Sequence, residues 1–244
     1  MSVYQQIISK KQIGKKQIAV LADPDKTSGK PLEKLCDFAQ QCKVDYFFVG
    51  GSLLTNGDLK ECVRTIKGCC NIPVILFPGS VQQIDNNADA LLFLSLISGR
   101  NPDLLIGHHV TAASLLADRK LEVIPTGYIL IESGSVTTVQ YVSNTLPIPA
   151  SKTDIAAATA LAGELLGMKL IFAEAGSGAK NPVSEEIIAA IKKLITVPLI
   201  VGGGIRTPER LISSFNAGAD LIVIGNSLEN NPELLWDMME AVQG

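Results

Sequence analysis

The stretch PLIVGGGIRTPER, residues 198–210, joins a short apolar run, three consecutive glycines and the start of a helix. Thr207 followed by Pro208 is typical of a helix N-cap with proline at the first helical position. The glycines before it permit a tight turn whose backbone N–H groups can bind an anion. The segment therefore predicts a buried strand, a turn and a helix in immediate succession.

Similar apolar runs recur along the whole chain, with amphipathic stretches between most of them. Nearly continuous apolar strands are typical of a parallel sheet that is covered by helices. Strands and helices alternating through 244 residues predict a (β/α)8 TIM barrel, and we expect residues 1–244 to form a single domain because no linker or repeat divides them. The predicted strands are residues 17–23, 45–51, 73–79, 90–96, 122–132, 169–175, 198–204 and 221–227, and the clearest helices are residues 31–42, 101–118, 153–166, 184–194 and 208–217.

One connection is too short for a barrel helix. Only VQQIDNNAD, residues 81–89, lies between the third and fourth predicted strands. This length accommodates roughly two helical turns. We therefore expect the outer ring of helices to be open on that side.

The composition favours a soluble cytoplasmic protein. The apolar runs are too short to span a bilayer, and no basic-then-apolar leader opens the chain. Five cysteines without a C-x-x-C spacing indicate reduced structural thiols. A net charge of −3 argues against a nucleic-acid partner.

In a TIM barrel the active site is built from the loops that follow the strands. After the sixth, seventh and eighth predicted strands these loops are EAGSGAK, GGGIRTP and GNSLEN. Glycine-rich loops and a helix N-terminus at these strands predict a phosphate site, although glycines at such positions also serve as simple turns. Glu174 precedes the first glycine of EAGSGAK, where its charge would repel a phosphate.

Asp23 and Asp25, in the loop ADPDK, are candidates for two roles. Asp-Pro often starts a helix, so both carboxylates could simply cap the helix that follows. Alternatively, this loop binds a hard divalent cation such as Mg²⁺, and Ser52 at the end of the second strand could supply a second oxygen ligand. Such a cation would be held by few protein ligands and completed by a diphosphate.

The ordered set ADPDK, FVGGS, EAGSGA, VGGGIRTPE and IGNSLE, together with SGRNP and PIPASK, resembles the geranylgeranylglyceryl phosphate synthase family, which includes heptaprenylglyceryl phosphate synthases. The resemblance runs from about residue 17 to the end of the eighth strand. Within the family, the chain resembles the archaeal-type branch, which includes Bacteroidetes members. Another branch has Lys at the position of Leu21. It implies a TIM barrel whose third helix is replaced by a loop.

The resemblance also implies an activity, the Mg²⁺-dependent transfer of a long prenyl group from its diphosphate to the sn-3 hydroxyl of sn-glycerol 1-phosphate. The expected donor is geranylgeranyl diphosphate. Mg²⁺ would be bound by Asp23 and Ser52. Many relatives have Tyr in place of Phe172. It further implies a homo-oligomer, a dimer or a hexamer, with peripheral membrane contact through the prenyl product. Glycerol 1-phosphate would be held by Phe172, Ala173, Glu174, Ala175, Gly176, Ser177, Gly178, Gly203, Gly204, Gly225 and Asn226.

We interpret Glu174 and Asp23 as the catalytic residues. Glu174 would accept the proton of the acceptor hydroxyl and stabilise positive charge on the allylic carbon; its alternative role is an ion pair with Lys169 or Lys180. Arg100 and Lys152 are hypothesised to hold the diphosphate, and are otherwise solvated loop charges.

Two competing functions remain open at this point. One is another phosphate-binding barrel enzyme, such as a sugar-phosphate isomerase or synthase, which would favour paired catalytic acids or a Lys–Glu pair at the strand ends. The other is a non-catalytic phosphate-binding protein, which would bind glycerol phosphate without releasing diphosphate.

Overall fold

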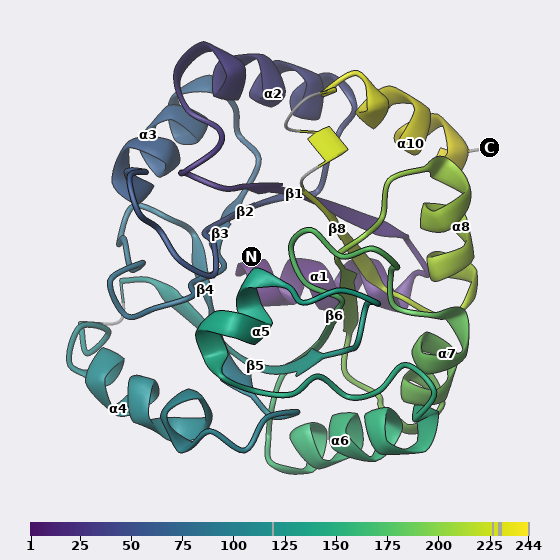
Figure 1. Ribbon diagram of the computed structural model, residues 1–244. Helices are drawn as coiled ribbons and strands as arrows, with labels where there is room; N and C mark the ends of the chain where they lie inside the picture. The colour runs from purple at the N-terminus through teal and green to yellow at the C-terminus, as the bar shows by residue number, and fades with distance from the viewer. Residues whose placement is uncertain (119, 226, 229–230, 244) are drawn as a thin grey trace.

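Eight parallel strands form a closed barrel in chain order in the computed structural model, which describes residues 1–118, 120–225, 227–228 and 231–243 (Figure 1). The first and last strands pair in parallel and close the barrel. The predicted (β/α)8 fold is therefore confirmed, and each of the predicted strands is present. The strands are β1 (Gln17–Ala22), β2 (Tyr46–Val49), β3 (Val74–Leu76), β4 (Ala90–Leu96), β5 (Glu122–Leu130), β6 (Leu170–Glu174), β7 (Leu199–Gly202) and β8 (Leu221–Ile224).

The helices follow the amphipathic stretches of the sequence. Thr207 caps α8 by accepting a hydrogen bond from the backbone N–H of Arg210 at 3.4 Å, and Pro208 occupies the first turn. The helices are α1 (Val3–Gln12), α2 (Gly29–Gln41), α3 (Leu59–Cys69), α4 (His108–Ala113), α5 (Thr138–Ser143), α6 (Thr153–Leu165), α7 (Glu185–Leu194), α8 (Pro208–Asn216) and α10 (Leu234–Gln243).

The single helix predicted for residues 101–118 is wrong in detail. The chain forms a π-helical segment, η1 (Asp103–Gly107), which leads directly into the short α4. A single π turn spans too few residues for apolar periodicity to reveal that its hydrogen bonds run from i to i+5 rather than from i to i+4.

The third barrel helix is absent, as the short connection predicted. Residues 77–89, between β3 and β4, contain turns and bends but no helix. The outer ring is consequently open between α3 and α4 (Figure 1).

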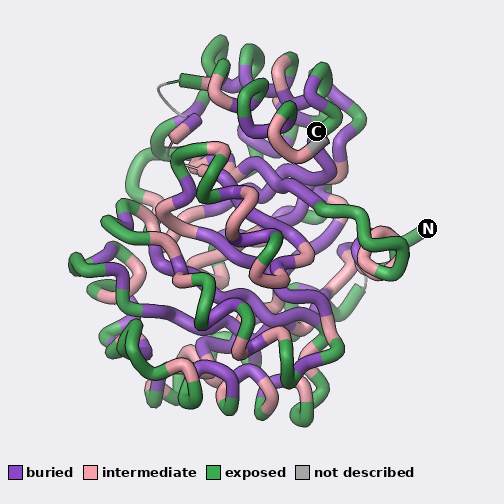
Figure 2. The backbone as a smooth tube through the Cα atoms, turned by 90° about the vertical axis from the view of Figure 1, so that its right-hand side faces the viewer, coloured by how far each residue is buried: buried purple, intermediate pink, exposed green. Residues whose placement is uncertain are grey.

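Helix α1 lies at the amino-terminal end of the barrel, away from the loops that follow the strands. Its buried Val3 and Ile7 pack against the side chains that fill the barrel. The carboxylate of Glu122 accepts hydrogen bonds from the N–H groups of Val3 at 2.6 Å and Tyr4 at 3.2 Å, which satisfies donors that a helix N-terminus leaves unpaired. Figure 2 shows this N-terminal segment projecting beyond the buried strands.

The core has two layers separated by the sheet. One cluster fills the barrel and the other lies between the strands and the outer helices. Successive strand residues alternate between them, so in β6 the side chains of Phe172 and Glu174 point inward while Ile171 and Ala173 face the helices. Within the described part of the chain, none of the helices has both the length and the apolar character needed to cross a membrane.

Candidate active site

Glu174 ends β6 with its side chain turned into the mouth of the barrel. The side chain is only 7% exposed, and Oε1 accepts a hydrogen bond from the N–H of Gly176 at 2.8 Å. Burial raises the pKa of Glu174 from 4.5 to about 7, although the Gly176 N–H lowers it in part. A carboxylate with this pKa exchanges protons readily near neutral pH.

Two glycines at the end of the neighbouring strand, one in β7 and one directly after it, make room for this carboxylate. A methyl group on Gly202 would lie 2.3 Å from Glu174 Oε2, and one on Gly203 would lie 2.4 Å from Oε1. Gly203 also has a φ of +81°, a conformation that favours glycine. The glycine run after β7 therefore serves the glutamate as well as any phosphate.

A polar cavity of ≈ 180 Å³ brings together the residues that the sequence singled out at several strand ends. Its wall includes the backbone of the loops after β6, β7 and β8, and the amino end of α8 begins close behind the β7 loop. Such an arrangement of N–H groups and a helix N-terminus favours an anion. The predicted site residues in this wall are Asp23, Ser52, Glu174, Gly176, Ser177, Gly178, Gly203, Gly204 and Gly225; Asn226 lies outside the described residues.

Asp23 lies at the end of β1 beside the β2 loop. Its Oδ1 accepts a hydrogen bond from the N–H of Asp25 at 3.1 Å, and its Oδ2 lies 3.2 Å from Lys26 Nζ. A methyl group on Gly51 would lie only 3.3 Å from Asp23 Oδ1. The residue before Ser52 is thus in contact distance of the carboxylate, and both Asp23 and Ser52 line the polar cavity.

Asp25 has a structural task. Its carboxylate accepts hydrogen bonds from the N–H groups of Thr55, Asn56 and Gly57 and from the Thr55 hydroxyl. These hydrogen bonds, that of the Thr55 N–H foremost, lower the pKa of Asp25 to about 2. Asp25 therefore ties the β1 loop to the β2 loop rather than capping α2.

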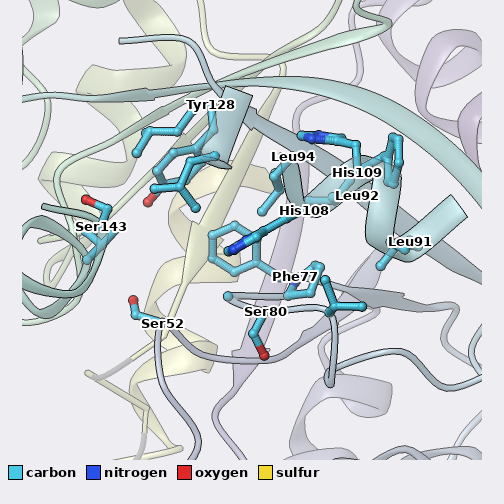
Figure 3. Close-up of a pocket in the computed structure, with 18 of the residues that line it drawn as sticks. Ser52, Phe77, Ser80, Leu91, Leu92, Leu94, His108, His109, Tyr128 and Ser143 are labelled. Carbon is cyan, nitrogen blue, oxygen red and sulfur yellow. The ribbon is translucent and has the colours of Figure 1, made fainter. Parts of the chain in front are cut away.

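An apolar cavity of ≈ 190 Å³ adjoins the polar one, on the side where the third helix is missing. The cavity is lined by leucines of β4 and by residues of the segment after β3, of α4 and of α5. Figure 3 shows Phe77 among Leu92, Leu94 and His108. The two cavities share part of their walls. The shared residues are Gly51, Ser52, Phe77, Tyr128 and Val139.

Three predicted contact residues lie behind the polar cavity rather than in its wall. Phe172 is fully buried in the barrel, where its ring stacks on Phe77 at a centroid distance of 5.1 Å. Ala173 and Ala175 point outward into the layer beneath the helices. The ring of a tyrosine at position 172 would therefore lie in the aromatic cluster below the carboxylate. This cluster includes Tyr128, whose ring centroid lies 5.5 Å from that of Phe172.

The structure does not bring Arg100 or Lys152 into the wall of either cavity. Arg100 turns back on its own loop, where Nη1 donates a hydrogen bond to the carbonyl of Gly99 at 2.7 Å. Lys152 is exposed at the N-cap position of α6. Their role in holding a diphosphate stays a prediction.

Two residues in the polar wall were not singled out from the sequence. Tyr128 of β5 lines both cavities, and burial together with the charge of Glu174 raises its pKa well above the usual value. Its phenol therefore remains a hydrogen-bond donor. Arg206 follows the β7 glycines, and its guanidinium donates a hydrogen bond to the carbonyl of Ala179 at 2.8 Å. Its position as a basic residue just after a predicted phosphate loop could have identified it from the sequence.

Known proteins match this chain over almost its whole length. The PcrB family model matches residues 11–243. A geranylgeranylglyceryl phosphate synthase of Chitinophaga pinensis is 50% identical over 240 residues, covering 98% of this chain and 95% of that protein. The enzyme of the same name from Pyrococcus furiosus is 46% identical over 212 residues, with 86% and 84% covered.

A solved structure agrees with these sequence matches. The (S)-3-O-geranylgeranylglyceryl phosphate synthase of Thermoplasma acidophilum, crystallised with its substrate sn-glycerol-1-phosphate, superposes with a TM-score of 0.92 at 35% identity. The match covers 99% of this chain and 98% of that one. The resemblance drawn from the sequence motifs is confirmed.

Proposed function

The chain belongs to the PcrB family, and from that premise we propose that it transfers a geranylgeranyl group from geranylgeranyl diphosphate to the sn-3 hydroxyl of sn-glycerol 1-phosphate. The products are the prenylglyceryl phosphate ether and diphosphate. The observation that carries this proposal is the pair of adjoining cavities, one polar with glycine loops and one apolar, which share a wall at Ser52 and Tyr128. A substrate pair with two phosphate ends and one long apolar tail fits such a pair of cavities.

The acceptor occupies the polar cavity. Its phosphate is held by N–H groups of the glycine loops after β6, β7 and β8, aided by the positive end of α8. Glu174 already accepts the N–H of Gly176, so the other N–H groups of these loops would hold the phosphate while the reacting hydroxyl would lie beside the carboxylate. The carboxylate and the anion loop therefore bind different ends of glycerol 1-phosphate, which resolves the apparent conflict of charge.

The reaction is a displacement at the allylic carbon. The sn-3 oxygen forms a bond to C1 as the bond from C1 to the diphosphate oxygen breaks, and diphosphate leaves with the electron pair. Glu174 accepts the hydroxyl proton, and its charge stabilises the positive charge that develops on C1. Holding the hydroxyl against C1 turns a bimolecular encounter into a positioned one.

The donor side of the site fits Mg²⁺. Among the described residues no group of three or more His, Cys, Asp or Glu side chains is placed to hold a metal ion. Asp23 and Ser52 would instead supply one carboxylate and one hydroxyl, and substrate phosphate and water the remaining ligands, a set that Mg²⁺ accepts. When bound, Mg²⁺ would neutralise the charge of the departing diphosphate.

The prenyl tail lies in the apolar cavity and extends toward the gap left by the third helix. Exposed apolar side chains lie in and beside α5, whose Val139 and Val142 line that cavity. They are compatible with peripheral membrane contact during entry of the donor or release of the product. These exposed side chains are Val136, Tyr141 and Leu146.

We further propose that residues 1–244 form a single domain, that several copies of the chain associate, and that the protein is cytoplasmic. Helix α6 carries exposed Ile155 and is followed by exposed Leu166, with Leu165 also exposed at its end. Apolar side chains on an outer helix support a homo-oligomer, a dimer or a hexamer. Five free cysteines fit a reducing compartment.

A substitution at Ala112, in the wall of the apolar cavity, tests whether the prenyl tail lies there. Ala112 of α4 is buried in the apolar cavity, so Ala112→Phe would occupy space that the distal isoprene units need. At about 0.8 kcal/mol per displaced methylene, two lost methylenes raise the KM for geranylgeranyl diphosphate about tenfold. The KM for geranyl diphosphate, measured in the same assay, is expected to change far less.

Ala113→Phe is the matched control, because Ala113 is exposed on the same helix. It is expected to retain the donor preference of the unmodified protein. An equal rise in KM for the short and the long donor in Ala112→Phe would remove this cavity from the path of the tail.

The proposal is tested by supplying purified protein with Mg²⁺, labelled glycerol 1-phosphate and prenyl diphosphates of graded length. A prenyltransferase forms an ether product whose yield depends on donor length. A sugar-phosphate enzyme forms none. A non-catalytic phosphate-binding protein binds glycerol 1-phosphate without releasing diphosphate.

A further inference from the structure

Gln83 lies in residues 77–89, the segment that stands where the third helix is missing. It is a polar residue, yet only 3% exposed. Both ends of its amide are paired with backbone groups. Nε2 donates to the carbonyl of Gly51 at 2.8 Å, and Oε1 accepts from the N–H groups of Gly51 at 3.1 Å and Gly79 at 3.3 Å.

The two turns that this amide connects touch through their backbones. A methyl group on Gly79 would lie 2.4 Å from the carbonyl oxygen of Gly51 and 2.5 Å from that of Ser52. One on Gly50 would lie 2.1 Å from the carbonyl oxygen of Phe77. No side chain fits between the turns, and the amide of Gln83 adds three hydrogen bonds to the one that the Phe77 N–H donates to the Val49 carbonyl.

Gly51 occupies a particular place in the site. It lines both cavities, it precedes Ser52, and a methyl group on it would lie 3.3 Å from Asp23 Oδ1. The amide of Gln83 binds both the N–H and the carbonyl of this one residue. A shift of Gly51 would therefore change the separation of the Asp23 carboxylate and the Ser52 hydroxyl.

We propose that Gln83 is a positioning residue for the diphosphate end of the donor, acting through Gly51 to hold Ser52 and Asp23 toward the same phosphate oxygens. This inference rests on the proposed function, which assigns that end of the site to the donor. The loop that replaces the third helix then has two tasks: it leaves the barrel side open for the tail, and it orders the neighbouring loop.

The chain offers a matched pair of glutamines for the test. Gln82 is exposed, whereas Gln83 is buried. Gln83→Met keeps the length of the side chain but removes all three hydrogen bonds, and Gln82→Met makes the same chemical change one residue earlier. Binding of inorganic diphosphate with Mg²⁺ is measured by calorimetry, and KM is measured separately for the prenyl diphosphate and for glycerol 1-phosphate.

Gln83→Met is expected to weaken diphosphate binding and raise the KM for the donor at least about tenfold, the lower range for loss of a partner that orients a ligand. The KM for glycerol 1-phosphate is expected to stay within about twofold, because the glycine loops that bind its phosphate lie on β6 to β8. Hydrogen exchange at the Gly51 N–H is expected to accelerate. Gln82→Met should match the unmodified protein in each measurement.

Unchanged diphosphate affinity in folded Gln83→Met would overturn the inference, and so would a parallel rise in both KM values, which indicates general loosening. If Gln83→Met does not fold, Gln83→Asn keeps the amide but shortens its reach, and the same split between the two KM values is expected. If the unmodified protein binds diphosphate but forms no ether, the transferase proposal fails. The difference in diphosphate affinity between the two methionine variants still decides the role of Gln83.

Discussion

Glu174→Gln is expected to lower turnover at least about a hundredfold, the range typical of a lost acid–base group. The amide cannot accept the hydroxyl proton and carries no charge to stabilise C1. Its oxygen can still accept the Gly176 N–H, and the glycines that accommodate the carboxylate accommodate an amide of the same shape. Steady-state kinetics with both substrates saturating would measure the loss.

The same substitution is expected to stabilise the fold at alkaline pH. Because burial raises the pKa of Glu174 to about 7, the folded protein binds a proton more tightly than the unfolded chain. The stability contributed by this group is complete below pH 4.5 and is lost as the pH rises through about 7. At 1.36 kcal/mol per pKa unit, burying the charge costs about 3 kcal/mol at pH 8.

Glu174→Gln avoids that cost, so its free energy of unfolding should exceed that of the unmodified protein at pH 8 and approach it at pH 4.5. Denaturant titrations at the two pH values would measure this. Glu132→Gln is the control, since Glu132 is an exposed carboxylate after β5 and should affect neither quantity. Wild-type turnover in folded Glu174→Gln would remove the glutamate from the mechanism.

Asp23→Asn carries the second large expected effect. The amide oxygen can keep the hydrogen bond from the Asp25 N–H, so the loop should retain its shape while losing the negative charge. Neutralising a leaving group with a metal ion is worth several kcal/mol. Losing most of that ion at ordinary Mg²⁺ concentrations is expected to lower the rate at least about a hundredfold.

The diagnostic measurement for Asp23→Asn is the Mg²⁺ concentration that gives half-maximal rate, which should rise, with activity partly recovered at high Mg²⁺. Asp37→Asn removes an exposed carboxylate of α2 and should leave the dependence on Mg²⁺ unchanged. An identical Mg²⁺ dependence in Asp23→Asn and the unmodified protein would assign the cation to other groups.

The strands and the missing helix were predictable because both depend on local pattern. Strands buried on both faces read as continuous apolar runs, and the nine residues 81–89 are simply too few for a barrel helix. The glycine loops and Glu174 followed from their positions at strand ends. These features require no knowledge of which side chains meet.

The remaining features depend on contacts between distant segments, which the sequence does not display. Tyr128 reads as an ordinary apolar strand residue until β5 is placed beside Glu174. Gln83 is indistinguishable from Gln82 until the turn of β2 is placed against it. The sequence also does not display that Arg100 donates hydrogen bonds to carbonyls of its own loop; its role at the diphosphate stays a prediction.

The proposed transferase activity is tested by the conversion of labelled glycerol 1-phosphate and geranylgeranyl diphosphate in the presence of Mg²⁺. We expect label to pass into a lipid-soluble ether phosphate, with one diphosphate released for each ether formed. Chelation of Mg²⁺ should stop both together. Folded protein that binds glycerol 1-phosphate but yields neither ether nor diphosphate would contradict it.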